Sequence, residues 1–157
     1  MPDEINPDEI NAFVPGPRVH IQGRAGGPLS GLTFAAKDLF DVAGHPTGGG
    51  NPDWARSNPV PTRHAWAVQR LLDAGATLIG KTITDEVSLG ILGENAFDGT
   101  PKNVRAPGRV PGGSSSGSAA AVAAGAGTEV DHVIGAANGF FIVLDDEDRV
   151  TEVAKIF

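Results

Sequence analysis

Hydrophobic and polar positions along the first 125 residues define two short apolar runs with an amphipathic stretch between them. Residues 31–38 and 76–81 are the apolar runs, and their length suits short buried strands. Residues 65–74 carry apolar side chains at helical spacing, and Gly75 follows them where the helix is expected to end. A strand, a crossover helix and a second strand predict a βαβ unit, so the sheet is expected to be at least partly parallel.

Two further stretches predict short helices, and much of the remaining chain is expected to be loop. Residues 2–11 hold Pro-Asp-Glu-Ile-Asn twice, with acids just after each proline, which favours an amphipathic terminal helix. Residues 84–92 predict another helix, with Thr84 as its cap. Segments rich in glycine, proline or asparagine predict irregular loops at 15–29, 44–62 and 93–113.

A Gly/Ser-rich stretch leads directly into a run of small residues. Residues 111–118 read Pro-Gly-Gly-Ser-Ser-Ser-Gly-Ser and predict a loop, whereas the alanine-rich residues 119–125 predict a helix. Such a junction directs backbone N–H groups outward at the positive end of the helix dipole, where an anion, an oxyanion or a hydrogen-bond network can be held. A flexible linker is the alternative, but linkers do not usually run into a small-residue helix suited to burial.

Composition narrows the class of protein. The length of 157 residues suits one domain, and 40% hydrophobic residues are enough for a core. A net charge of −7 argues against nucleic acid or an anionic membrane as partner. The absence of cysteine excludes a disulfide, a thiolate nucleophile and a cysteine-based metal site. No signal-peptide pattern and no membrane-spanning apolar run occur, so we expect a cytoplasmic location.

A lysine at the end of the first apolar run is a candidate base. Burial at a strand end lowers the pKa of Lys37 and makes its neutral amine available, unless Lys37 is a surface residue capping an edge strand. Asp38 and Asp41 nearby would favour its charged form unless they point elsewhere. His45 and His64 have no partner at ligand spacing, so we interpret them as hydrogen-bonded loop or helix-end residues and expect no metal.

Three blocks of the sequence resemble the amidase signature family of serine hydrolases. They are the run Gly-Leu-Thr-Phe-Ala-Ala-Lys-Asp at 31–38 with Val-Ala-Gly at 42–44, residues 72–82 with Asp-Glu at 85–86, and residues 109–123. The resemblance covers roughly residues 28–125. It implies the α/β class, an α/β/α layered fold whose mixed sheet is incomplete in this chain, and hydrolysis of small-molecule amides without a metal or cofactor.

The resemblance also implies roles for individual residues. Lys37 matches the catalytic lysine, and Ser114 matches a bridging serine that follows a cis peptide bond. Neutral Lys37 would relay a proton through Ser114 to and from a nucleophilic serine. The backbone N–H groups of Gly112 and Gly113 would bind the substrate and its oxyanion.

The sequence departs from the family where the nucleophile is expected. The family places that serine some two dozen residues after the bridging serine, in a Gly-x-Asp-x-Gly-Gly-Ser stretch. Residues 130–139 begin similarly but lack the Asp and the Gly-Gly-Ser, and no serine occurs after Ser118. Thr128 and Thr151 are the hydroxyls left, and neither lies in a Gly-rich turn, so we expect neither to act as nucleophile.

Three interpretations remain open from the sequence. The chain is a truncated amidase of weak or no activity, or a non-catalytic remnant that binds a ligand or partner chain through the Gly/Ser loop. Alternatively it is a reduced Ser–Lys hydrolase in which Lys37 activates a serine of the loop itself. The candidate nucleophiles of that third interpretation are Ser114, Ser115 and Ser116.

The last thirty residues predict a β-hairpin. Residues 139–144 and 150–157 are the expected strands, and the acidic residues 145–148 between them predict a solvated turn, since they lack the alternating spacing of a calcium loop. We expect residues 1–125 and 126–157 to be two segments of one domain. Exposed edges of an incomplete sheet would favour a homo-oligomer or a partner chain that completes it.

Overall fold

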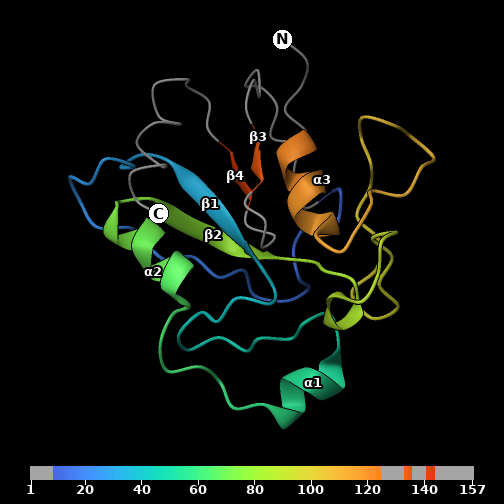
Figure 1. Cartoon of the computed structure of the whole chain (residues 1–157), viewed down its shortest axis with the longest axis horizontal. Helices are drawn as coiled ribbons and strands as arrows, with labels where there is room; N and C mark the ends of the chain where they lie inside the picture. The colour runs from blue at the N-terminus through green and yellow to red at the C-terminus, as the bar shows by residue number, and fades with distance from the viewer. Residues whose placement is uncertain (1–8, 125–132, 136–140, 144–157) are drawn as a thin grey trace.

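The computed structural model describes residues 9–124, 133–135 and 141–143 (Figure 1). A parallel pair of strands lies at its centre, in which β1 (Thr33–Lys37) runs beside β2 (Thr77–Thr82). Both strands are largely buried, as expected for parallel strands covered on both faces. The predicted βαβ unit is confirmed, because α2 (Trp66–Asp73) connects them.

Additional pairing makes the sheet mixed. Phe13 bridges Thr82 and Ile21 bridges Leu78, both antiparallel, so the N-terminal segment runs along the edge of β2 that β1 leaves open. β3 (Val133–Gly135) and β4 (Phe141–Val143) form a separate antiparallel pair. β4 lies against β1 and α3 (Ser116–Ala124) (Figure 1).

Two apolar cores lie on opposite faces of the central strands. Along β2, Leu78 belongs to the first core and Ile79 packs against the second, as side-chain alternation along a strand requires. α2 contributes Val68, Leu71 and Leu72 to the first core. α3 contributes Ala120 and Ala124 to the second. One helix on each face is the α/β/α layering that the resemblance implies.

α3 packs closely against the end of β2. A Cβ on Gly117 would collide with the backbone of Ala12 and Ile83, so only glycine fits there. The Ser118 hydroxyl shares a 2.7 Å hydrogen bond with the hydroxyl of Thr82. The helix begins at Ser116, three residues before the predicted start, because these small residues pack as its buried first turn.

The prediction of a helix over residues 84–92 is wrong. Only a 3-10 turn, η1 (Glu86–Ser88), forms there, and Thr84 does not cap it, because Asp85 occupies the N-cap position. Val87 and Ser88 have φ values of +48° and +61°, which an α-helix cannot accommodate. The turn is instead fixed by tertiary contact, since the Val87 amide donates to the carbonyl of Gly49 at 2.7 Å.

The loop predicted over residues 44–62 contains a helix. α1 (Pro52–Ser57) begins after Asn51, whose side chain accepts hydrogen bonds from the amides of Asp53 at 2.7 Å and Trp54 at 3.0 Å. A capping asparagine followed by proline at the first helical position is a helix-start signal. The glycines and prolines around this signal favour a loop, and they concealed it. No side chain of α1 is buried.

Several predicted segments fall partly or wholly outside the described residues. β4 lies within the predicted strand at 139–144, and its partner is β3. The predicted second strand at 150–157, the acidic turn at 145–148, Thr128 and Thr151 lie outside. Of the predicted helix at 2–11, only residues 9–11 are described, and they form a turn. Among the described helices, none is long and apolar enough to cross a membrane.

Candidate active site

Lys37 ends β1 with its amine directed at two serine hydroxyls. The residue is 5% exposed. Its Nζ lies 2.7 Å from Ser114 Oγ and 3.1 Å from Ser88 Oγ. The expectation that Lys37 reaches the serine loop is therefore confirmed, and the alternative of a solvated lysine capping an edge strand is wrong.

Ser114 and Ser88 complete a closed group of three polar atoms. Their hydroxyls share a 2.7 Å hydrogen bond, so each member of the Lys37–Ser88–Ser114 cluster contacts the other two. The peptide bond between Gly113 and Ser114 is cis, as the resemblance implied. The Ser114 carbonyl accepts a 3.0 Å hydrogen bond from the Asp85 amide, which ties the serine loop to the turn that carries Ser88.

The surroundings of Lys37 favour its neutral form. Burial lowers the pKa of Lys37, and the nearby charge of Asp85 partly opposes that shift. The two neighbouring acids that could have favoured the charged form point elsewhere. Asp38 lies 2.6 Å from the amine of Lys81, and Asp41 accepts a 2.7 Å hydrogen bond from the hydroxyl of Thr47.

Asp85 is a buried acid behind the cluster. Its side chain packs so tightly against Gly90 and Gly113 that a Cβ on either glycine would collide with the carboxylate. One oxygen accepts a 3.3 Å hydrogen bond from the Gly93 amide, and the other has no hydrogen-bond partner within the described part of the chain. Asp85 thus supplies a negative charge that acts on Lys37, and its side chain packs between the two loops that carry Gly90 and Gly113.

The remaining predicted site residues occupy other positions. The amide of Gly112 donates to the carbonyl of Leu92 at 3.1 Å, and that of Gly113 donates to the carbonyl of Ile91 at 2.9 Å. Neither amide is available to a substrate oxygen in this arrangement. Ser115 and Ser116 lie at the start of α3, and neither hydroxyl is hydrogen-bonded to Lys37 in the described residues. Ser116 is fully buried.

Sequence reasoning missed Ser88 and the role of Asp85. Ser88 was hidden within a stretch interpreted as helix. Two glycines closely following it, Gly90 and Gly93, were the available signal, because glycine disfavours a helix interior. Asp85 belongs to the second block of the resemblance, but no pattern in the sequence indicates that its side chain faces Lys37.

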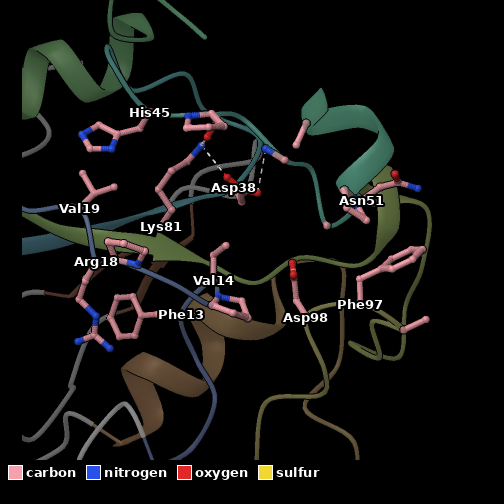
Figure 2. A pocket seen from close by; sticks show the side chains of 18 residues that line it. Phe13, Val14, Arg18, Val19, Asp38, His45, Asn51, Lys81, Phe97 and Asp98 are labelled. Carbon is pink, nitrogen blue, oxygen red and sulfur yellow. Dashed lines mark hydrogen bonds and ion pairs between the residues drawn. The ribbon is translucent and has the colours of Figure 1, made fainter. Parts of the chain in front are cut away.

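A second feature is a pocket of about 730 Å³ lined by residues that include Phe13, Arg18 and Asp98 (Figure 2). Asp38 and Lys81 form their ion pair in its wall, and the Lys81 amine also donates to the carbonyl of Pro46 at 3.0 Å. Burial raises the pKa of Asp98, and the charge of Asp38 adds to the shift. Neither Lys37 nor Ser114 lines this pocket.

His45 and His64 both take part in local structure. His45 lines the pocket (Figure 2), and its amide donates to the carbonyl of Val42 at 3.0 Å. The Nδ1 of His64 accepts a 3.1 Å hydrogen bond from the Ala43 amide. These contacts fit the interpretation of both histidines as hydrogen-bonded loop or helix-end residues.

Comparison with known proteins gives consistent matches. The family model described as Amidase matches residues 17–129. Amidase 1 of Oryza sativa subsp. japonica is 61% identical over 97 residues, which are 62% of this chain and 22% of that protein. The protein named translocon at the outer membrane of chloroplasts 64, from Pisum sativum, is 54% identical over 97 residues, 62% of this chain and 16% of that one.

Solved structures show the same relation. The structure of 6-aminohexanoate cyclic dimer hydrolase superposes with a TM-score of 0.63 at 32% identity, covering 75% of this chain and 25% of that one. The relation seen in the sequence therefore extends to the fold, which is α/β and shares the framework of that structure. The chain spans about a fifth of the length of the rice relative it matches.

Proposed function

The chain belongs to the amidase family, and on that premise we propose that the Lys37–Ser88–Ser114 cluster serves a site that hydrolyses the carbon–nitrogen bond of small amides. The observation that carries the proposal is the 2.7 Å contact between the desolvated amine of Lys37 and the hydroxyl of Ser114. A neutral amine held against a hydroxyl is the arrangement that general-base activation of a weak nucleophile requires.

Proton transfer follows from this contact. Neutral Lys37 accepts the proton of Ser114, and Ser114 in turn accepts a proton from the attacking hydroxyl. When the tetrahedral intermediate collapses, the same relay runs backward and protonates the leaving nitrogen. Asp85 favours the lysinium that forms midway, because its charge raises the pKa of Lys37. The amine can therefore both accept the proton and return it.

Charge developing on the substrate oxygen needs hydrogen-bond donors. Because the amides of Gly112 and Gly113 already donate to backbone carbonyls, we assign this role to the amide of Ser115, which is half-buried. This amide donates to no acceptor among the residues described, and it lies directly before α3, at the positive end of the helix dipole. Because this donor directly follows Ser114 in the chain, we expect slow turnover rather than none.

Amide hydrolysis by the purified chain tests the proposal. A panel of small primary amides and anilides is incubated with the wild type, and released acid and amine are both quantified. Lys37→Met and Ser114→Ala are each expected to lower kcat/KM by roughly a hundredfold or more, the usual range for loss of general-base catalysis. Lys102→Met is the matched control, because Lys102 is exposed and lies outside the cluster.

Two results would overturn the proposal. One is turnover that survives both substitutions in the cluster. The other is a wild-type chain that binds the amides without releasing acid and amine, which would instead identify a ligand-binding site.

A further inference from the structure

We propose that Ser88 is the nucleophile of this site. The family resemblance assigns no role to Ser88, and the inference rests on the proposed function, because it concerns the hydroxyl that the Lys37–Ser114 relay serves. It starts from geometry, since Ser88 Oγ lies 2.7 Å from Ser114 Oγ and 3.1 Å from Lys37 Nζ. A nucleophilic hydroxyl must lie within hydrogen-bond reach of its base, and Ser88 meets this condition by both routes.

Apart from Ser114, the other serines of the chain lack this combination of contacts. Ser30 and Ser57 are exposed, Ser115 is half-buried, and none of the three is hydrogen-bonded to the Lys37 amine in the described residues. Ser116 is fully buried, and Ser118 is buried and bonded to Thr82. Ser114 Oγ lies closer to the amine than Ser88 Oγ does, at 2.7 Å against 3.1 Å. This distance suits a relay, because Ser114 can give its proton to Lys37 while accepting one from Ser88.

The backbone aims Ser88 at the cluster. Its φ of +61° follows +48° at Val87, in a region that residues other than glycine rarely adopt. Three backbone hydrogen bonds hold the turn, donated by Val87 at 2.7 Å, by Ser88 at 2.9 Å and by Leu89 at 2.9 Å. Non-glycine residues held in this region cluster at active sites and ligand clamps.

A substrate can approach the hydroxyl from the solvent side. Ser88 itself is half-buried, but Leu89 directly after it is 86% exposed and Ile91 is 82% exposed. Ser88 is thus backed by the desolvated lysine and edged by open apolar surface. An amide carbonyl with an apolar acyl group could contact this surface while its carbon meets the Ser88 oxygen.

In the acylation step, Ser88 Oγ forms a bond to the amide carbon, and the carbonyl π pair moves to oxygen. The Ser88 proton passes to Ser114 while the Ser114 proton passes to Lys37. Collapse re-forms the carbonyl, breaks the carbon–nitrogen bond and returns the proton through the relay to the departing amine. Water then attacks the Ser88 ester, gives its proton to the same relay, and the acid leaves as Ser88 regains a proton.

An alkyl fluorophosphonate tests the inference independently of the amide. The probe forms a phosphorus–oxygen bond with an activated serine and expels fluoride, and peptide mass spectrometry locates the label. We expect the label on Ser88, its loss in Ser88→Ala and Ser88→Gly, and at least a tenfold slower reaction in Lys37→Met. Ser57→Ala is the control, expected to label like the wild type.

Ser88→Gly guards against a folding artefact, because glycine accepts the left-handed backbone of this turn without strain. A label on Ser114, Ser115 or Ser116, a label that persists in both Ser88 variants, or no label at all on a folded wild type would overturn the inference. Hydrolysis of the amide panel decides the proposed function separately. A wild type that hydrolyses amides equally well as Ser88→Gly would refute Ser88 alone and leave amide hydrolysis standing.

Discussion

Replacing Lys81 by methionine tests how strongly the end of β1 is held in place. The Lys81 amine lies 2.6 Å from the Asp38 carboxylate, with side-chain exposures of 5% and 4%, and it also donates to the carbonyl of Pro46. Asp38 directly follows Lys37 in the chain. Removing the amine therefore leaves a buried carboxylate and a carbonyl without their cation, next to the residue that we propose as the base.

The size of the expected loss of stability follows from the burial of the Asp38–Lys81 ion pair. Breaking a buried ion pair by removing one partner lowers the free energy of unfolding by about 3–5 kcal/mol. For a domain of this size, each kcal/mol corresponds to about 2–4 °C in Tm, so we expect a decrease of about 6–20 °C. Lys81→Met combined with Asp38→Asn should be more stable than Lys81→Met alone, because asparagine removes the uncompensated charge and can still accept from the Gly48 amide.

The stability lost in Lys81→Met is expected to depend on pH. Burial raises the pKa of Asp38 above its ordinary value of 3.8, and Lys81 opposes that shift. A carboxyl whose pKa is higher in the folded state stabilises the fold most below its unfolded pKa, and that contribution is lost as pH rises through the folded pKa. Without Lys81 the raised pKa rises further, so the loss of stability in Lys81→Met should be larger at pH 8 than at pH 5.

Urea and thermal unfolding of the wild type, the two single variants and the double variant provide the assay. Lys102→Met serves as the exposed-lysine control. A Lys81→Met variant within about 1 kcal/mol of the wild type, or a double variant no more stable than Lys81→Met, would refute the view that this pair is a buried and coupled one.

Two further predictions concern the cluster and the core. Asp85→Asn should move the acid limb of the pH profile of kcat/KM to lower pH: hydrolysis needs neutral Lys37, and the charge of Asp85 raises the pKa of that lysine. A limb that stays in place or moves to higher pH would contradict this role. Leu71→Ala, at a fully buried position of α2, should lower the free energy of unfolding by about 2–5 kcal/mol. Urea titration measures it, with the exposed Leu89→Ala expected to change stability by no more than about 0.5 kcal/mol as the control.

The parts of the fold that the sequence predicted are those with a strong local pattern. β1, α2 and β2 combine apolar periodicity with a glycine at the helix end, Gly75, whose φ of +102° fits that position. The contact between Lys37 and Ser114 was expected because both residues lie in blocks that resemble one family. Local pattern and family resemblance indicate the same structure at these positions, and tertiary packing does not alter it.

The parts that were missed depend on contacts between distant segments. The turn at Ser88 is fixed by the Gly49 carbonyl, some forty residues earlier in the chain, and no periodicity within residues 84–92 encodes that contact. The amides of Gly112 and Gly113 likewise donate hydrogen bonds to the carbonyls of residues 92 and 91. The sequence left open whether Asp38 would favour charged Lys37 or point elsewhere, and the buried amine of Lys81 pairs with it.

The protonation state of Lys37 is the most direct test of the account, because it requires no knowledge of the substrate. Carbon-13 NMR of the Lys37 ε-carbon, assigned by its loss in Lys37→Arg, follows that amine through a pH titration. We predict that Lys37 has a pKa below the ordinary lysine value of 10.5. Titration at or above that value would show that the site does not favour the neutral amine and would contradict the role of Lys37 as the base of the Lys37–Ser88–Ser114 cluster.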